Sequence, residues 1–263
     1  MKTVLVTGTS TGIGLATALA AADAGWRVIA TMRDTGKAAP ELKERANVEV
    51  RRLDVTDPAS VEACLAGLER LDAVVNNAGA GHLGTLEQES VDEVRKVMEV
   101  NFFGVLNVTK AALPLLRASK GRVVTVTSVG GVVGQPFNEA YCAAKFAVEG
   151  YMESLAPVAA TAGVRVSVVE PGAVASEFVS NVDAMPEVGP YAPALANYLA
   201  RAREAFASAQ TSEQAAAPIV ALLDAERPAF RVQTSEAARA FTGLKLADGD
   251  GSAVQGLTAG WIA

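Results

Sequence analysis

Seven short runs rich in β-branched residues alternate with longer segments rich in alanine and leucine. The runs lie at residues 2–7, 27–31, 48–54, 72–76, 122–128, 165–170 and 230–234. Helical patterns lie near residues 12–24, 36–46, 58–70, 90–118, 139–162 and 211–225. Apolar strands that alternate with helices indicate βαβ units, in which helices cover both faces of a parallel sheet. The sequence therefore predicts an α/β fold with a doubly wound, mostly parallel, seven-stranded sheet in one domain over residues 1–263.

Prolines mark the places where this regular pattern weakens. Pro114 and Pro157 lie inside two of the helical patterns, and we expect each to kink or interrupt its helix. The least regular segment is 173–210, which contains three prolines. Irregular segments of this length in compact domains are often functional lids. We predict a substrate lid over about 173–210, and the alternative is a surface excursion without a role.

Composition excludes several classes of partner and site. The net charge of −6 and the pI near 5.0 argue against a nucleic-acid partner and against an anionic membrane surface. The N-terminal apolar run is too short for a signal peptide, and the chain has no run of about 18 apolar residues, so we predict no membrane span. Cys64 and Cys142 lack metal-like spacing and are predicted to be reduced thiols of a cytoplasmic protein. The single histidine, His82, argues against a histidine-based triad or metal site, and we expect it at a pocket rim or on the surface.

A glycine-rich segment, TGTSTGIG, follows the first strand run and places Gly8, Gly12 and Gly14 before a helical pattern. Its spacing differs from the G-x-G-x-x-G pattern. The glycines nevertheless allow a tight turn, a close approach of the backbone to a phosphate, and close helix–strand packing. The next helix then points its first amides and its positive dipole at that phosphate. We predict a dinucleotide pyrophosphate site here, and an ordinary strand–turn–helix connection is the alternative.

The end of the second strand run selects the cofactor. An acidic residue about 20 residues beyond the glycines would hold the hydroxyls of the adenosine ribose. Met32 lies near that position and is followed by Arg33 and Asp34. Because a guanidinium suits a 2′-phosphate in charge and in forked geometry, we favour NADP(H) over NAD(H). The alternative is that Asp34 binds the ribose while Arg33 is a solvated surface charge.

Polar residues also end the third and fourth strand runs. Asp54, in LDVTD, can accept a hydrogen bond from an adenine amino group, or it can be an ordinary turn residue. The fourth run leads into NNAG at residues 76–79. Ligands of such sheets bind at the carboxyl edge, where this segment lies, although its asparagines can also simply shape the turn.

Together these motifs resemble those of the short-chain dehydrogenases/reductases of the compact single-domain type. The matching segments are TGTSTGIG, LDVTD, NNAG, VNFFG with Asn101, Ser128, YCAAK at 141–145 and PG at 171–172. They follow the family's order and spacing over roughly residues 1–180. ATMRD and PAFRVQTS also resemble the branch of 17β-hydroxysteroid and retinol dehydrogenases, which mostly prefers NADP(H). The resemblance implies a Rossmann-type fold and a homodimer or homotetramer, often formed through two long helices, here about 90–118 and 139–162.

The resemblance also implies which residues bind the cofactor. They are Gly8, Ser10, Thr11, Gly12, Ile13, Gly14, Arg33, Asp54, Val55, Asn77, Ala78, Gly79, Tyr141, Lys145, Pro171, Gly172, Val174 and Ser176. Ser176 departs from the family, because many relatives carry a threonine there that contacts the nicotinamide carboxamide. Serine keeps the hydroxyl, so we expect the same contact. Beyond about residue 180 the match is loose, which leaves the substrate unspecified.

Ketone reduction requires a hydride at the carbonyl carbon and a proton at its oxygen. Tyr141 can deliver that proton, although a free tyrosine has a pKa of about 10. Lys145 lies one helical turn later, and its ammonium favours phenolate, so we expect it to lower the pKa of Tyr141. We expect Ser128 to hydrogen-bond the substrate oxygen. The alternatives are a packing tyrosine, a solvated lysine and a turn-forming serine.

The resemblance implies two further roles. Lys145 also holds the nicotinamide ribose, and Asn101 holds a water that relays protons to solvent. We therefore predict an NADP(H)-dependent oxidoreductase that interconverts a ketone or aldehyde and its alcohol, with Asn101, Ser128, Tyr141 and Lys145 as catalytic residues and no metal. The alternatives are an NAD(H)-dependent hydroxysteroid- or retinol-type dehydrogenase, an epimerase or dehydratase of the same family, and a non-catalytic NADP(H)-sensing regulator.

Apolar residues in the 173–210 segment indicate an apolar substrate, unless they pack the lid or an interface. They are Phe178, Val179, Met185, Val188, Tyr191, Leu195 and Tyr198.

Overall fold

The fold is built on one parallel sheet of seven strands, shown in a computed structural model that describes residues 1–177, 183–184, 189–250 and 252–261. The strands are β1 (Thr3–Thr7), β2 (Arg27–Met32), β3 (Val48–Arg52), β4 (Ala73–Asn76), β6 (Arg122–Val126), β7 (Arg165–Glu170) and β11 (Arg231–Gln233). Their order in the sheet is β11-β7-β6-β4-β1-β2-β3. Every pair of neighbours is parallel, which confirms the Rossmann-type sheet predicted from the alternating pattern.

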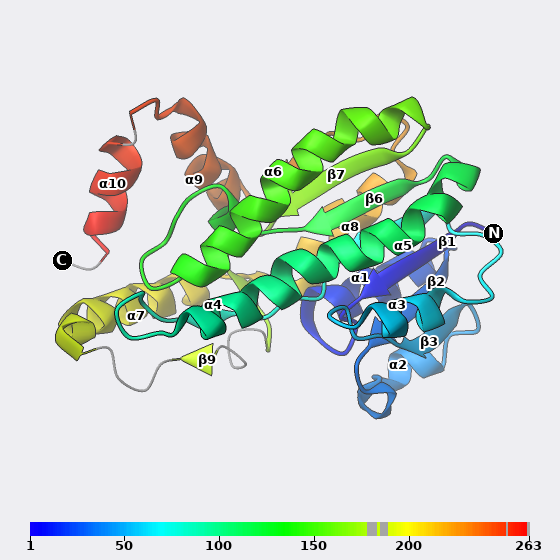
Figure 1. Ribbon diagram of the computed structural model, residues 1–263, viewed down its shortest axis with the longest axis horizontal. Coiled ribbons are helices and arrows are strands. Elements are labelled where there is room, and N and C mark those ends of the chain that lie inside the picture. The colour runs from blue at the N-terminus through cyan, green and yellow to red at the C-terminus, as the bar shows by residue number, and fades with distance from the viewer. Residues whose placement is uncertain (178–182, 185–188, 251, 262–263) are drawn as a thin grey trace.

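Helices pack on both faces of this sheet, as Figure 1 shows. They are α1 (Gly12–Asp23), α2 (Pro40–Lys43), α3 (Pro58–Leu65), α4 (Val91–Met98), α5 (Gly104–Ser119), α6 (Glu139–Thr161), α7 (Ala192–Ala207), α8 (Ser212–Asp224), α9 (Glu236–Ala247) and α10 (Ser252–Ala259). Short elements connect them: η1 (Thr35–Lys37), β5 (His82–Leu83), η2 (Glu99–Phe103), η3 (Val129–Gly131), β8 (Val174–Ala175), β9 (Asp183–Ala184), η4 (Gly189–Tyr191) and β10 (Gln210–Thr211).

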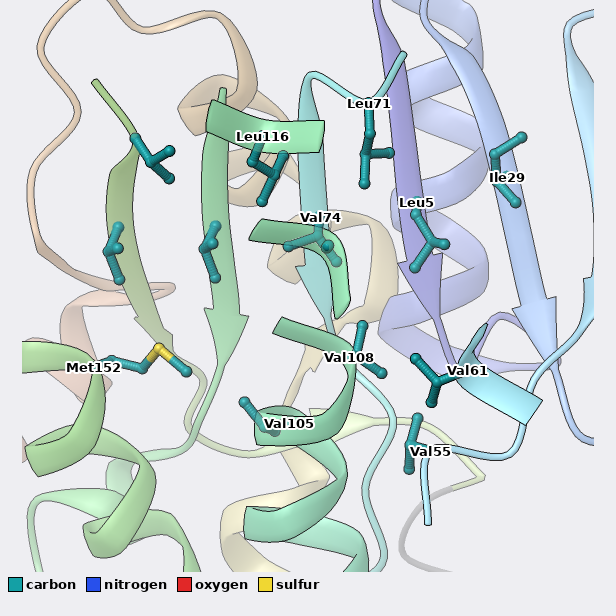
Figure 2. Close-up of a cluster of buried hydrophobic side chains, with 14 of the residues drawn as sticks. Leu5, Ile29, Val55, Val61, Leu71, Val74, Val105, Val108, Leu116 and Met152 are labelled. Carbon is teal, nitrogen blue, oxygen red and sulfur yellow. The ribbon is translucent and has the colours of Figure 1, made fainter. Parts of the chain in front are cut away.

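The alternation of side chains along each strand divides the core into two layers. Leu5 and Val74 face α3, α5 and α6, where they pack with Val108, Leu116 and Met152 (Figure 2). Their strand neighbours face α1 and α8 on the opposite side of the sheet. Each fully buried side chain of this size contributes about 1.5–3 kcal/mol to folding. Helices cover both layers of the core.

The helices differ from the sequence prediction in three places. The segment 36–46 holds only η1 and the four-residue α2, because Pro40 starts a new helix there. The pattern at 90–118 is divided by η2, a π-helical turn between α4 and α5. The sequence pattern missed α9 and α10, and it also missed α7, which lies within the predicted lid.

Neither helix that we expected a proline to break is interrupted. Both α5 and α6 continue through Pro114 and Pro157. Proline removes the donor to the carbonyl four residues earlier, and these carbonyls belong to Lys110 and Glu153, which are exposed. Water can serve the freed carbonyls there. The predicted interruption does not occur, and the kink, the other predicted outcome, stays a prediction.

The carboxyl ends of the central strands meet at one edge of the sheet. Gly8 follows β1, Asn77 follows β4, Ser128 closely follows β6, and Pro171 follows β7. Sheet order reverses between β1 and β4, and ligands of open α/β sheets bind at such a switch point. The fold thus brings motifs that are far apart in the sequence to one edge.

Candidate active site

Close packing around the loop between β1 and α1 leaves no space for side chains at its glycines. A Cβ at Gly14 would lie 2.1 Å from the Gly8 oxygen and 2.4 Å from Nδ2 of Asn77. Gly8 and Gly12 have φ values of 70° and 60°, which other residues rarely adopt. A Cβ at Gly12 would lie 3.3 Å from the Cβ of Ser176. No side chain of the loop therefore covers its backbone where it approaches Ser176, and a phosphate-binding loop requires such an accessible backbone.

Asn77 fastens this loop to the end of β4. Its Nδ2 donates to the backbone oxygens of Thr7 (2.9 Å) and Gly8 (3.1 Å). In return Oγ1 of Thr7 accepts hydrogen bonds from the backbone nitrogens of Asn77 and Ala78, each at 2.9 Å. Thr9 ties the loop to β2 through Thr31. Sequence reasoning missed Thr7 and Thr9, whose only signal is a hydroxyl residue on each side of the first glycine.

The first turn of α1 faces the same loop. Thr11 is its N-cap in an extended conformation, and its side chain forms no capping hydrogen bond. Ser10, Thr11 and Ile13 are half-buried. Free first-turn amides and the helix dipole together favour an anion, so the residues present fit the pyrophosphate of a dinucleotide.

Charged residues surround the ends of β2 and β3. Arg33 is exposed, and Oδ1 of Asp34 accepts a hydrogen bond from the Gly36 nitrogen at 2.9 Å. Oδ1 of Asp54 accepts from the nitrogen and the hydroxyl of Thr56, at 3.0 and 2.8 Å. Burial opposes the ionisation of Asp54, but the Thr56 hydrogen bonds and the Arg33 charge outweigh it and lower its pKa. Asp54 thus shapes a turn, and its contact with adenine stays a prediction.

Val55 lies beside Asp54, where the predicted adenine side of the site meets α5. The Val55 side chain is buried, and its carbonyl accepts a hydrogen bond from Nδ2 of Asn107 at 3.0 Å. A Cβ at Gly104 would lie 2.6 Å from Cγ2 of Val55. The start of α5 therefore fixes the position of Val55.

Asn101 lies in the π-helical turn η2 and is completely buried. Its Nδ2 donates to the carbonyls of Ala80 (2.9 Å) and Val97 (3.1 Å), while its Oδ1 accepts from the Ala80 nitrogen (3.2 Å). A Cβ at Gly79 would lie 2.9 Å from Oδ1 of Asn101 and 3.6 Å from Nζ of Lys145. Gly79 thus brings the NNAG segment, Asn101 and Lys145 together. Helical turns of this π type often occur at functional sites.

Tyr141, Lys145 and Ser128 also meet here. Nζ of Lys145 lies 5.7 Å from the centre of the Tyr141 ring and donates to the Val126 oxygen at 3.3 Å. Ser128 hydrogen-bonds Tyr141, and its Oγ accepts from the Gly130 nitrogen at 3.0 Å. Lys145 is 4% exposed, so it is not a solvated helix lysine. The structure therefore brings all four predicted catalytic residues to one place.

Burial controls the ionisation of this group. It raises the pKa of Tyr141 to about 12, although the hydrogen bond from Ser128 favours phenolate. It lowers the pKa of Lys145 to about 8, although the charge of Glu149 favours the ammonium. The sequence predicts that Lys145 lowers the pKa of Tyr141, and in the protein without cofactor the shift has the opposite sign. The loss of water around the phenol outweighs any effect of the lysine.

The segment after β7 closes the site towards the glycine loop. The Pro171 carbonyl accepts a hydrogen bond from the Val129 nitrogen at 2.9 Å, which joins it to the Ser128 loop. Gly172 follows, and Val174 in β8 pairs with Gln210 in β10. Ser176 then faces Gly12. The predicted cofactor residues of this segment thus lie opposite the pyrophosphate cradle.

His82 and the cysteines are buried. Nε2 of His82 lies 2.6 Å from Oε2 of Glu89, so the predicted position at a rim or on the surface was wrong. His82 lies in β5, which pairs with β9 and contacts α6. Cys64 and Cys142 are free thiols, and burial raises the pKa of each to about 11.

The predicted lid is only partly described. Phe178, Val179, Met185 and Val188 lie outside the described residues. In α7, the Tyr198 hydroxyl accepts a hydrogen bond from Nδ2 of Asn138 at 2.7 Å, and its ring lies 5.9 Å from that of Phe137. Asn138 precedes α6, the helix of Tyr141. One helix of this segment therefore contacts the start of the helix that carries the candidate catalytic residues.

The described ranges hold neither a candidate membrane span nor a candidate metal cluster. No helix there is both long and apolar enough to cross a membrane. In the same ranges, no three His, Cys, Asp or Glu side chains form a group that could hold a metal ion.

Comparisons with known proteins agree with this geometry. The family model for short chain dehydrogenases matches residues 2–187. Retinol dehydrogenase 8 of Homo sapiens is 38% identical over 274 residues, which cover 95% of this chain and 87% of that protein. 17-beta-hydroxysteroid dehydrogenase type 1 of Homo sapiens is 37% identical over 271 residues, covering 95% and 82%. A short chain dehydrogenase from Burkholderia cenocepacia J2315, solved in complex with NADP, superposes with a TM-score of 0.79 at 25% identity over 100% of both chains.

The chain belongs to the short-chain dehydrogenase family. Within it, the chain falls in the branch of hydroxysteroid and retinol dehydrogenases. It is an oxidoreductase that uses a nicotinamide dinucleotide.

Proposed function

We propose that this protein is an NADP(H)-dependent oxidoreductase that interconverts an apolar ketone or aldehyde and its alcohol. The observation that carries the proposal is the meeting of Ser128, Tyr141, Lys145 and Asn101 beside a glycine loop that no side chain fills. A bound nicotinamide supplies or accepts the hydride at its C4 carbon.

The residues of the chain handle the proton. A Tyr141 phenol with a pKa raised to about 12 is protonated at neutral pH, which is the form that donates a proton during carbonyl reduction. Ser128 hydrogen-bonds the same oxygen position as negative charge develops there. Lys145 is largely an ammonium at neutral pH and favours the resulting phenolate. Asn101 fixes the backbone beside Lys145 and supports the proton relay to solvent.

Arg33 supports the preference for NADP(H). Its guanidinium is exposed, and among the described side chains no carboxylate forms an ion pair with it. Asp34 instead uses one carboxylate oxygen to cap η1. A free guanidinium can accept the 2′-phosphate of NADP(H), whereas an acid already engaged in a cap is less suited to hold the ribose of NAD(H). NAD(H) remains the second choice.

The relatives of this chain and the side chains of α7 both support the proposal of an apolar substrate. The two human relatives are named for a retinoid and a steroid activity. Leu195 and Tyr198 are half-buried in α7, next to the start of α6. We propose that the segment 173–210 is the substrate lid, and that a retinol- or hydroxysteroid-type alcohol is the second candidate substrate.

Exposed aromatic side chains support a homodimer or homotetramer. Phe103, at the start of α5, is 43% exposed, and Tyr151 in α6 is 46% exposed. Both contact the Phe102 ring, so they form one apolar patch on the two long helices.

An absorbance assay at the nicotinamide band tests the function. NADPH and NADH are each offered with aliphatic, aromatic, steroid and retinoid carbonyls and with small charged ones. We expect turnover of apolar carbonyls with NADPH. Tyr141→Phe removes the proton donor and should lower kcat about a thousand-fold or more, while NADPH still binds. Tyr151→Phe, on an exposed turn of the same helix, should keep the wild-type rate.

Three outcomes contradict this proposal. A Tyr141→Phe variant that turns over at nearly the wild-type rate means that another group supplies the proton. Reaction of small charged carbonyls alone rejects the apolar substrate. Binding of NADPH without turnover of any carbonyl would favour the sensing regulator, which retention of both Tyr141 and Lys145 argues against.

A further inference from the structure

A buried cluster of charged residues lies directly behind Lys145. Glu149 is one turn further along α6, Glu170 ends β7, and Arg231 begins β11. The side chains of Glu149 and Glu170 are 5% and 0% exposed, and that of Arg231 is 22% exposed. Burial of two carboxylates is costly unless each is paired or protonated. Nothing in the proposed hydride or proton transfer uses this cluster.

Arg231 forms a hydrogen bond with Glu170 but only a longer ion pair with Glu149. Its Nη1 donates to Oε1 of Glu170 at 2.9 Å, and Gln233 donates to Oε2 of Glu170, also at 2.9 Å. The same Nη1 lies 3.2 Å from Oε2 of Glu149, but that oxygen accepts no hydrogen bond. Two buried carboxylates thus face one guanidinium, and the pair cannot readily hold two negative charges. Glu170, with a donor at each oxygen, is the one that is suited to ionise.

If only one of the two carboxyl groups ionises, the other holds a proton. The Thr127 hydroxyl lies beside Glu149, where that proton can form a hydrogen bond. Its Oγ1 is within hydrogen-bond distance of Oε1 of Glu149 and 3.0 Å from the Val169 carbonyl. A hydroxyl has one hydrogen and cannot donate to both acceptors. Both hydrogen bonds form together if Glu149 is protonated, since Glu149 then donates to Thr127 and Thr127 donates to Val169. A proton on Glu149 thus lets Thr127 bond to both oxygens, and the Val169 carbonyl also accepts from the Thr127 backbone nitrogen at 2.7 Å. The need for this proton comes from the two buried carboxylates that face one guanidinium.

We propose that Glu149 holds a proton and that its ionisation sets the charge of Lys145. Glu149 is then a positioning residue, because it acts on the reaction through Lys145. This inference rests on the oxidoreductase reaction proposed above. A neutral Glu149 leaves Lys145 without a close negative partner. An ionised Glu149 favours the ammonium form of Lys145, which the proposed mechanism requires beside Tyr141.

The charged neighbours of the two residues agree with this coupling. Burial raises the pKa of Glu149 to about 7, helped by Glu170 and Glu153 and opposed by Thr127 and Arg231. Glu149 is in turn the charge that favours the ammonium form of Lys145, whose pKa burial lowers to about 8. The other groups at Lys145 are the Tyr141 ring, Asn101 and the Val126 carbonyl, and none is charged at neutral pH.

The sign of the effect follows from these positions. As the pH rises through about 7, Glu149 loses its proton and its new negative charge holds Lys145 as an ammonium. Lys145 therefore stays charged to a higher pH than burial alone would allow. Without the Glu149 carboxylate, Lys145 should lose its proton at lower pH.

The test measures the two titrations directly in the protein without cofactor. The ε-carbons of lysine and the carboxyl carbons of glutamate are labelled with carbon-13, and their NMR shifts are followed against pH. Lys145→Arg assigns the Lys145 signal. In Glu149→Gln we expect the Lys145 midpoint to fall by about one pH unit. In the matched control, Glu62→Gln, which removes an exposed glutamate of α3, the midpoint should stay unchanged.

A second measurement needs no variant. If Glu149 and Lys145 are coupled, the Lys145 signal of the wild-type protein shows an inflection at the pH where a buried glutamate carboxyl titrates, near 7. The absence of that inflection, or a Lys145 midpoint that is the same in Glu149→Gln, overturns the proposal. These outcomes are independent of turnover. A shifted midpoint with no active carbonyl contradicts the proposed function alone, whereas turnover with an unchanged midpoint contradicts the role of Glu149 alone.

Discussion

The loop between β1 and α1 and the helix α7 are both parts of the predicted active site, the first for the cofactor and the second for the substrate. Packing constrains them very differently. α1 has 12 residues, and Gly14, Ala16, Thr17, Ala18, Ala21 and Ala22 are buried. α7 has 16 residues, and none is buried. In Figure 1 α1 lies against the sheet, whereas α7 lies at the end of the molecule that carries α9 and α10.

This contrast separates a part of the site where few sequences preserve the structure from a part where many sequences can. A Cβ at Gly8 or Gly14 would lie less than 3 Å from a backbone atom, and Gly12 has a positive φ, so the sequence of the glycine loop has little freedom. α7 is held by a few polar contacts, such as those of Tyr198 with Asn138 and of Tyr191 with Glu87. A dinucleotide has the same shape in every reaction, while substrates differ. We infer that α7 is where the substrate specificity of this chain can change without loss of the fold.

The largest effect is expected from Gly14→Ala. The new Cβ would lie 2.1 Å from the Gly8 oxygen, so the loop or the start of α1 must move. We expect the free energy of unfolding to fall by about 3 kcal/mol. Binding of the dinucleotide should weaken about a hundred-fold, because the displaced loop no longer presents its amides. Chemical denaturation and a fluorescence titration with NADPH measure the two quantities.

Gly150→Ala is the control for this change. Gly150 lies in α6 with open space around the position of a Cβ. Alanine should therefore raise the free energy of unfolding by about 0.5–1 kcal/mol and leave NADPH binding unchanged. If Gly14→Ala behaves like Gly150→Ala, the tight packing of the glycine loop does not control the cofactor site.

A smaller and more selective effect is expected from Arg33→Ala. A charge-assisted hydrogen bond to a phosphate contributes about 1.5–3 kcal/mol. The dissociation constant of NADPH should therefore rise about ten- to a hundred-fold, while that of NADH changes little. Arg45→Ala removes the same charge from a surface pair with Asp23 and should affect neither. An equal loss for NADPH and NADH would place Arg33 outside the 2′-phosphate site.

Sequence patterns were informative where one physical requirement dominates. Continuous apolar strands and the glycines at 8, 12 and 14 each allow few structures, and the predicted sheet and loop are both present. α9 is as long as α1, but only Ala238 and Thr242 are buried in it, so its position depends on packing against a surface that the sequence does not display. The pattern also could not show η2, since a π turn has the same composition as the α-helix around it.

The ionisation of the site was the least predictable part. The helical spacing of Tyr141 and Lys145 was correctly read as proximity, and their ring–ammonium distance is 5.7 Å. Their pKa values instead depend on burial, and the neighbours of Lys145, such as Val126 in β6 and Gly79 after β4, come from distant parts of the chain. Glu149 and Arg231 were not selected from the sequence, because 82 residues separate them and only the order of β7 and β11 brings them together.

The smallest effect is expected on the α7 side, from Tyr198→Phe. The change keeps the ring against Phe137 and removes the hydrogen bond from Asn138, which costs about 1 kcal/mol. We expect KM for apolar carbonyls to rise about three- to five-fold and the melting temperature to fall by about 2–4 °C, with the NADPH dissociation constant unchanged. Tyr191→Phe removes a more exposed hydrogen bond to Glu87 and should change KM less than two-fold. If Tyr198→Phe instead weakens NADPH binding as much as substrate binding, α7 is coupled to the glycine loop and the two regions do not evolve their specificities separately.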